Sequence, residues 1–176
     1  MRALVDYESM VGNTRTIAGA IADGLRATLD VDLVEVGAAP TTVPDDVALL
    51  VVGGPTHAHG MSKPESRADS AKRAGERLVS RSSGIREWLG SLKSGSSRVA
   101  AAAFDTRIKG PGLIWGSAAK GADKSLRGLG FGVAAGPESF LVEGPTGPVF
   151  DRLVDGEVER ARRWGERLGA SLAGRA

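Results

Sequence analysis

Hydroxyl and main-chain amide groups in a short polar stretch near the amino terminus are the first groups of this chain that could perform chemistry. Residues 7–15 read YESMVGNTR and lie between an apolar run and a segment of helical spacing. Where a chain leaves a strand to begin a helix, the first helical N–H groups lack acceptors and lie at the positive end of the helix dipole. Gly12 could ease such a turn, and Asn13 or Thr14 could cap the helix. The stretch therefore indicates either a capped turn or a phosphate site, in which the N–H groups act with the hydroxyls of Ser9 and Thr14.

The two histidines of the chain are the second candidate for chemistry. His57 and His59 are two residues apart, so in an extended loop their rings would face the same side. The chain contains no cysteine, and no carboxylate follows the histidines before Glu65, so we expect no metal site. The absence of cysteine also excludes disulfides and a thiol nucleophile, and it favours a cytoplasmic protein. Ring packing or loop hydrogen bonding is the simpler role for the two histidines.

The size and composition of the chain limit the classes of protein to which it can belong. With 176 residues, of which 41% are hydrophobic and 25% are charged, the chain is expected to form a single domain over residues 1–176. The formal net charge is +2 and only 5% of the residues are aromatic, so a nucleic-acid-binding surface is not indicated. No window approaches the roughly 18 apolar residues that a membrane span needs, so we expect no such span.

A cluster of charged residues follows the histidines, in residues 62–81. Three acidic side chains in this cluster are interleaved with six basic ones, which are Lys63, Arg67, Lys72, Arg73, Arg77 and Arg81. A solvated loop or helix face is the commoner explanation of such a run. If the cluster borders a binding site, long-range attraction would instead favour an anionic or acidic partner, such as a phosphorylated nicotinamide cofactor or an acidic redox protein.

Apolar runs and helical patterns alternate along the chain. Runs with the length and the β-branched content of strands lie at residues 2–7, 31–36, 47–53 and 98–104, with a weaker run within 131–144. Helical spacing is found at residues 13–29, 84–92, 116–130 and 155–174. This order predicts a mostly parallel sheet with helices on both faces. The third run shows no polar alternation, as expected of a central strand that is covered on both faces.

Glycine patterns indicate which kind of nucleotide such a sheet would bind. A dinucleotide fingerprint needs G-x-G-x-x-G between the first strand and its helix, and this chain offers only Gly12 there. A loose match at residues 130–135 leads into a strand and not into a helix, and no G-x-x-x-x-G-K-S/T pattern exists. In open α/β sheets the ligand lies beyond the carboxyl ends of the strands. Binding of a mononucleotide at that edge is therefore favoured over binding of a dinucleotide or a triphosphate.

Three segments of the chain resemble segments of the flavodoxin family. The stretch ESMVGNTRTIAGAI resembles the phosphate-binding loop S/T-x-T-G-x-T, with Ser9, Gly12 and Thr14 matching and Val11 in place of the more usual threonine. The stretch LLVVGGPTHAHG resembles an apolar strand that ends in a glycine-rich step and Pro-Thr, and AAFDTR falls where the family has its third flavin-contacting loop. The resemblance implies a flavodoxin-like three-layer α/β sandwich, with helices on both faces of a five-stranded, mostly parallel sheet of order 2-1-3-4-5.

The resemblance further implies a protein that binds FMN. The implied cofactor-binding residues are Ser9, Met10, Val11, Gly12, Asn13 and Thr14 at the phosphate; Pro55, Thr56, His57, Ala58, His59 and Gly60 along one side of the ring; and Phe104, Asp105, Thr106 and Arg107 at its pyrimidine end. Asp105 could equally be a turn residue. Because the flavin itself would perform the redox chemistry, no catalytic side chain is expected.

The function that the resemblance implies is electron transfer, with a redox protein or a nicotinamide-dependent reductase as the partner. Two alternatives stay open, which are a small FMN-dependent quinone-reducing oxidoreductase and a flavodoxin-fold interaction module that has lost its flavin. Familiar electron-carrying flavodoxins bracket the ring with Trp and Tyr and have acidic surfaces, whereas this chain has two histidines in that loop and is basic. We expect Trp88 and Trp164 to pack in the core or at its edge, whereas Trp115 could cover the flavin.

Overall fold

A computed structural model of the chain describes residues 1–110, 116–144 and 152–174. The strands are β1 (Arg2–Tyr7), β2 (Asp30–Glu35), β3 (Val47–His57), β4 (Gly60–Met61), β5 (Ala100–Ile108), β6 (Gly132–Val133) and β7 (Glu138–Val142). The helices are α1 (Asn13–Leu25), α2 (Pro64–Ala74), α3 (Ile85–Ser91), α4 (Ala118–Gly128) and α5 (Glu157–Ala173), with short 3-10 helices η1 (Val36–Ala38) and η2 (Gly75–Arg77). Each predicted strand overlaps an observed one, and the weak run within 131–144 is divided into β6 and β7.

The main strands form one parallel sheet in which β2, β1, β3 and β5 follow one another and β6 and β7 both lie alongside β5. β6 pairs with the start of β5, at Ala100 and Ala101, and β7 pairs with its end, from Phe104 to Ile108. These two short strands thus share the place of a fifth strand, and the predicted order 2-1-3-4-5 is confirmed. β4 is a short antiparallel partner of β3.

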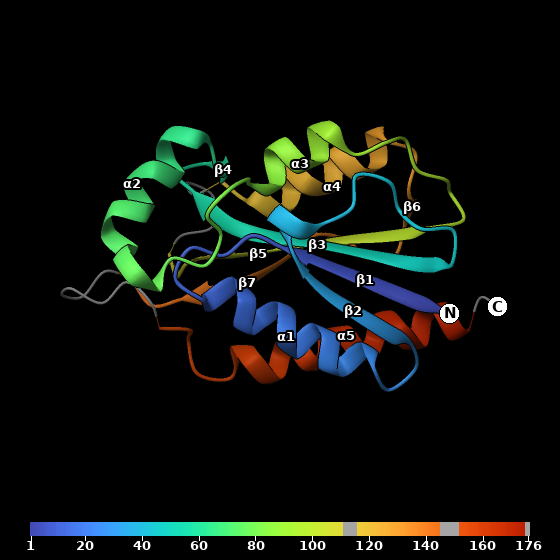
Figure 1. Cartoon of the computed structure of the whole chain (residues 1–176). Coiled ribbons are helices and arrows are strands. Elements are labelled where there is room, and N and C mark those ends of the chain that lie inside the picture. Colours follow the sequence, from blue (N-terminus) through green and yellow to red (C-terminus); the bar gives the residue numbers. More distant parts are fainter. Residues whose placement is uncertain (111–115, 145–151, 175–176) are drawn as a thin grey trace.

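Helices cover both faces of the sheet (Figure 1). α1 and α5 lie on one face, where Ile21, Val51 and Trp164 belong to the same hydrophobic core. α3 and α4 lie on the other face, over a second core that includes Leu50 and Trp88. Leu50 and Val51 are adjacent in β3 and point to opposite faces, and both are buried, which explains why this run shows no polar alternation. The predicted burial of Trp88 and Trp164 is confirmed.

The helices are shorter than the sequence patterns predict. α1 ends at Leu25, because residues 26–29 form the turn into β2. α4 begins at Ala118, where the hydroxyl of Ser117 accepts the N–H of Lys120 and caps the helix. Within the described ranges, none of the helices has the length and the apolar character to cross a membrane.

The basic cluster forms a helical segment outside the two helical layers. α2 and η2 together span residues 64–77, and we call this segment the arm. In Figure 1 the arm projects beyond the end of the sheet at which β3 and β4 meet. Ala74 is the only residue of α2 that is buried, so burial of apolar surface contributes little to the position of this helix.

Candidate functional site

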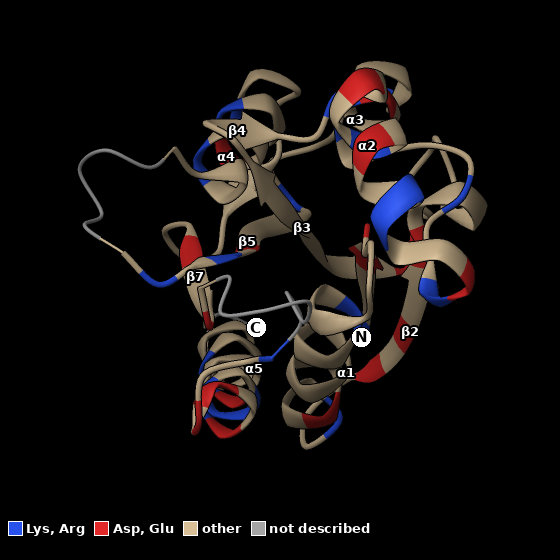
Figure 2. Ribbon diagram, turned by 90° about the vertical axis from the view of Figure 1, so that its left-hand side faces the viewer, with Lys and Arg blue, Asp and Glu red and all other residues tan. Residues whose placement is uncertain are grey.

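A pocket of about 670 Å³ lies at the carboxyl ends of the parallel strands. Its walls come from four parts of the chain: the loop between β1 and α1, the end of β3, the end of β5 with Val142 of β7, and the arm. Figure 2 looks onto this end of the molecule and shows these elements arranged around its centre. Clefts of a few hundred cubic ångströms at this edge are where open α/β sheets bind their ligands. The location predicted from the order of the elements is therefore where the pocket is found.

The loop between β1 and α1 forms the first wall. Gly12 occupies the position before the helix with a φ of 107°, which an L side chain rarely adopts, and it has no side chain of its own that could cap α1. The expectation that Asn13 or Thr14 caps the helix is wrong, because the helix begins at Asn13 and Gly12 occupies the capping position. The hydroxyl oxygen of Ser9 instead accepts the N–H groups of Gly12 (3.1 Å) and Arg15 (3.3 Å). Among the described residues, the N–H groups of Asn13 and Thr14 have no acceptor, so they can bind an anion.

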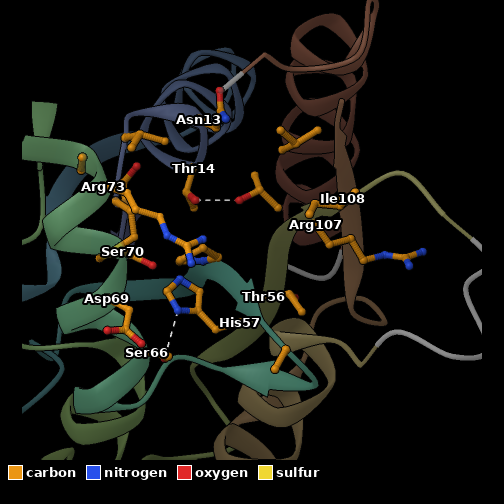
Figure 3. A pocket seen from close by; sticks show the side chains of 18 of the residues that line it. Asn13, Thr14, Thr56, His57, Ser66, Asp69, Ser70, Arg73, Arg107 and Ile108 are labelled. Atoms are coloured by element: carbon orange, nitrogen blue, oxygen red, sulfur yellow. Dashed lines mark hydrogen bonds between the residues drawn. The ribbon is translucent and has the colours of Figure 1, made fainter. Parts of the chain in front are cut away.

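A buried hydrogen bond connects this loop to the end of β5. The hydroxyl oxygens of Thr14 and Thr106 are 2.7 Å apart, and both side chains are buried. Both residues line the pocket, which places the first and the third predicted segments side by side (Figure 3). The bond joins two walls of the pocket that are 92 positions apart in the sequence, so it fixes the distance between them.

The end of β3 forms the second wall, with Pro55, Thr56, His57 and Ala58. The ring nitrogen Nδ1 of His57 lies 3.0 Å from the hydroxyl of Ser66 on the arm (Figure 3). Burial and the neighbouring guanidinium of Arg67 lower the pKa of His57 below its ordinary value, so this ring is neutral at neutral pH.

His59 does not share this environment. The chain turns between β3 and β4, with Ala58 at a φ of 52°, so the two histidines do not lie in an extended loop. His59 is exposed and is not among the pocket-lining residues, and neither is Gly60. The condition for the two rings to face the same side is therefore not met, because a tight turn separates the histidines.

The end of β5 contributes Thr106 and Arg107 to the pocket but not the side chains before them. The ring of Phe104 packs edge-on against Phe140 and Trp164, with ring centroids 6.2 and 6.4 Å apart, in the core beneath α1 and α5. Phe104 is fully buried and does not line the pocket. Its side chain therefore contacts the core and not a ligand in this pocket.

Asp105 is fully buried and serves the start of α4. Its Oδ2 atom accepts hydrogen bonds from the hydroxyls of Ser117 (2.6 Å) and Thr56 (3.0 Å) and from the N–H of Ala119 (3.0 Å). A carboxylate at a helix amino terminus satisfies N–H groups that lack acceptors. Asp105 does not line the pocket, so its side chain positions Thr56 and α4.

The arm forms the fourth wall, whereas its sequence pattern predicted only a solvated face or a charged border of the site. Six of its residues line the pocket, which are Ser66, Asp69, Ser70, Arg73, Ala74 and Arg77. Their spacing of three, four, seven, eight and eleven residues from Ser66 places them on one face of a helix. This spacing is visible in the sequence and could have indicated that the basic cluster has an inner face. Trp115, which could cover a flavin, lies outside the described residues.

A buried carboxylate ties the start of the arm, the fourth wall, to the first wall. Glu8 directly precedes the first loop, and its oxygens accept hydrogen bonds from the hydroxyl of Ser62 (2.6 Å) and the N–H of Ile85 (2.9 Å). Arg67 donates to Ser62 (3.0 Å) and forms an ion pair with Glu87 (3.0 Å). Burial raises the pKa of Glu8, and its hydrogen bonds oppose this shift. The network fixes the start of the arm against β1.

The sequence of the chain matches a family model. The model for flavodoxin matches residues 5–144, which is most of the chain. The chain belongs to the flavodoxin family. No curated protein matches its sequence closely enough to count as a relative.

Solved structures of flavodoxins share the fold. A flavodoxin from the domain Archaea is 20% identical, with 98% of this chain and 99% of that chain covered and a TM-score of 0.64. A flavodoxin from Streptococcus pneumoniae TIGR4 is 19% identical, with 97% and 99% covered and a TM-score of 0.61. The flavodiiron protein from Giardia intestinalis is 20% identical over 98% of this chain but only 36% of that chain, with a TM-score of 0.59. The TM-scores and the coverage show a common fold, which is the flavodoxin-like sandwich predicted from the sequence.

Membership of this family implies a flavin cofactor and electron transfer, and the pocket fits such a cofactor. The N–H groups of Asn13 and Thr14 can donate hydrogen bonds to a phosphate at one end of the pocket. Pro55, the ring of His57 and Ile108 offer flat or apolar surface for a ring system. Eleven of the residues predicted to bind FMN line the pocket, namely Ser9, Met10, Val11, Asn13, Thr14, Pro55, Thr56, His57, Ala58, Thr106 and Arg107.

Proposed function

We propose that the pocket binds FMN without a covalent bond and that the protein carries electrons between redox partners. The observation that carries this proposal is the position of the N–H groups of Asn13 and Thr14, which have no acceptor among the described residues and belong to residues that line one end of the pocket. A phosphate bound by main-chain N–H groups at a helix amino terminus needs no lysine, and residues 8–14 contain none. FMN is the flavin that presents a single terminal phosphate to such a site.

Each wall of the pocket would hold a different part of the cofactor. The main chain of residues 9–14 would bind the phosphate, Pro55 to Ala58 would lie along one side of the ring system, and Thr106 with Arg107 would lie at its polar end. The bound flavin supplies reversible uptake and release of electrons. The chain contributes a fixed geometry, because the bond between Thr14 and Thr106 and the network around Glu8 tie the walls together.

The first experiment tests binding of the cofactor. The purified protein should show the visible absorption of a flavin, or its apoprotein should bind added FMN more tightly than riboflavin. Thr14→Ala should weaken FMN more than riboflavin, by about 1 kcal/mol or more, because it removes a polar group beside a charged ligand. Thr106→Val is the comparison, because it removes the same hydrogen bond without changing the first loop. Thr106 would lie at the ring end that both flavins share, so this variant should change the binding of FMN and riboflavin equally. A protein that binds neither flavin, or that binds both equally, would contradict the proposed site.

The second experiment distinguishes a carrier from a quinone-reducing enzyme. A carrier should be reduced slowly by a nicotinamide cofactor alone and quickly when a reductase is added, and it should pass electrons to a redox protein. Rapid oxidation of a nicotinamide cofactor by a quinone, with no reductase present, would support the quinone-reducing alternative. The partner that we propose is a redox protein or a nicotinamide-dependent reductase.

A further inference from the structure

The inner face of the arm is polar although it lines a pocket. Ser66, Ser70, Arg73 and Arg77 lie on this face, and Ala74 is the only buried residue of α2. A helix that packs against a protein core normally presents an apolar stripe to it. The inner face of the arm therefore does not serve core packing, and its composition suits a charged ligand in the pocket.

The arm is held next to the loop between β1 and α1. Just after η2, the N–H of Val79 donates to the carbonyl oxygen of Met10 (2.9 Å) and the N–H of Ser80 donates to that of Ser9 (2.8 Å). The N–H of Ser9 in turn donates to the hydroxyl of Ser80 (2.9 Å). These bonds fix the end of the arm beside the first loop, only two residues after Arg77.

The charges on this face favour an anion. Arg73 and Arg77 provide two positive charges and Asp69 one negative charge. In Figure 3 the side chain of Arg73 extends from α2 into the pocket, toward the space between Thr14 and His57. Both arginines also interact within the chain, but a guanidinium has five N–H donors, and its flat fork matches a phosphate. Lys72 pairs with Asp69 at 3.7 Å, has a side chain that is 80% exposed and does not line the pocket.

We propose that Arg73 and Arg77 of the arm bind the phosphate of FMN, so that the phosphate is held by the amino terminus of α1 on one side and by the arm on the other. This inference rests on the proposed function, because it takes FMN to be the ligand. It adds two cationic residues that lie about 60 positions after the first loop in the sequence. The residues from 9 to 14 alone would make a neutral phosphate site, whereas the arm makes the site cationic.

The test compares two flavins and two variants. The dissociation constants of FMN and riboflavin are measured by fluorescence quenching with the apoprotein of the wild type, of Arg73→Gln/Arg77→Gln and of Lys72→Gln. The double variant should bind FMN about tenfold or more weakly and riboflavin within about twofold of the wild type, because a charge-assisted hydrogen bond to phosphate is lost. Lys72→Gln should leave both constants within about twofold, since this residue changes the charge of the same helix outside the pocket. The FMN constant of the wild type should also rise with salt more steeply than that of the double variant.

Inorganic phosphate gives a second readout that needs no flavin. Phosphate should raise the melting temperature of the wild-type apoprotein more than that of the double variant. An unchanged FMN constant in the double variant, or equal losses for FMN and riboflavin, would overturn this inference while leaving FMN binding established. A wild type that binds neither flavin would overturn the proposed function and this inference with it.

Discussion

The environment of Asp6 disfavours the charged form of its carboxyl group. Both carboxylate oxygens are buried and have no hydrogen-bond partner among the described residues, and burial raises the pKa from 3.8 to about 8. The folded protein therefore holds a proton that the unfolded chain releases near its ordinary pKa. The free energy of unfolding should fall as the pH rises through the window from 3.8 to about 8.

Replacement of Asp6 tests this cost. Its neighbours on the paired strands are Val34 and Val52, so Asp6→Val suits the sheet. We expect the variant to raise the free energy of unfolding by about 1–3 kcal/mol at neutral pH, with a larger gain at about pH 8 than at about pH 5. Urea unfolding at the two pH values measures the difference. Gains that are equal at both pH values would show that folding does not raise the pKa of Asp6, because the folded and unfolded chains would then bind the same number of protons over this range.

His57 and His59 should affect a bound flavin differently. The pKa of His57 is lowered by burial and by Arg67, so the ring becomes cationic only when the pH falls below its ordinary range. A cation in the pocket wall reduces the cost of negative charge on a reduced flavin. We expect the midpoint potential to rise at acidic pH in the wild type and less so in His57→Ala, with no difference above neutral pH. His59→Ala is the control and should follow the wild type, and potentiometric titration is the measurement. If both variants lose the rise of the midpoint potential at acidic pH, the effect does not come from His57 alone.

At the scale of elements, α1 and α5 approach each other closely because of glycines. A Cβ atom on Gly24 would lie 2.0 Å from the carbonyl oxygen of Arg162, and one on Gly165 would lie 2.2 Å from that of Ile21. We expect Gly24→Ala to lower the free energy of unfolding by about 1–3 kcal/mol, because the helix backbones must move apart. Gly19→Ala in the same helix meets no atom within 4 Å and should stabilise by up to about 1 kcal/mol. Urea denaturation of both variants is the measurement. Stabilisation by both would show that the helices adjust without cost, and destabilisation by both would show that the close approach at Gly24 does not decide the sign.

At the scale of the whole molecule, the charge is nearly balanced, so the distribution of charge matters more than the net value of +2. Lys63 and Arg81 are exposed at the two ends of the segment that contains the arm, whereas Lys93 and Arg98 are exposed on the loop before β5, near the opposite ends of the strands. An acidic partner that docks near the pocket would be attracted by the first pair and not by the second.

Two double variants with equal changes of charge test where the partner docks. Lys63→Gln/Arg81→Gln should reduce the rate of electron transfer with an acidic redox protein about two- to fivefold at low ionic strength, and the difference should vanish at high salt. Lys93→Gln/Arg98→Gln should have a much smaller effect in the same stopped-flow measurement. If both variants lose rate equally, the partner responds to net charge, and docking near the arm is not supported.

The secondary-structure elements and the first loop could be predicted from the amino-acid sequence, because both depend on neighbouring residues. The unbroken apolar run at 47–53 is found in β3, and the spacing of Ser9, Gly12 and Thr14 marks a turn into a helix whose N–H groups are open. The strand order was implied by the resemblance to flavodoxins, which covers three successive strand ends, and it is the order found. These features need no knowledge of distant contacts.

Which side chains face the pocket depends on how the elements pack and could not be predicted from local patterns. Phe104 faces the core beneath α1 and α5, and Asp105 faces α4, because alternate residues of a strand point to opposite layers and only the packing decides which layer. His57 and His59 are separated by a turn at Ala58, and no local sequence pattern predicts the positive φ of this alanine. The arm was not predicted as a helix of the pocket wall, because a polar helix has no apolar periodicity. Its inner face lines the pocket because hydrogen bonds between residues 79–80 and 9–10 hold together two segments that are about 70 positions apart.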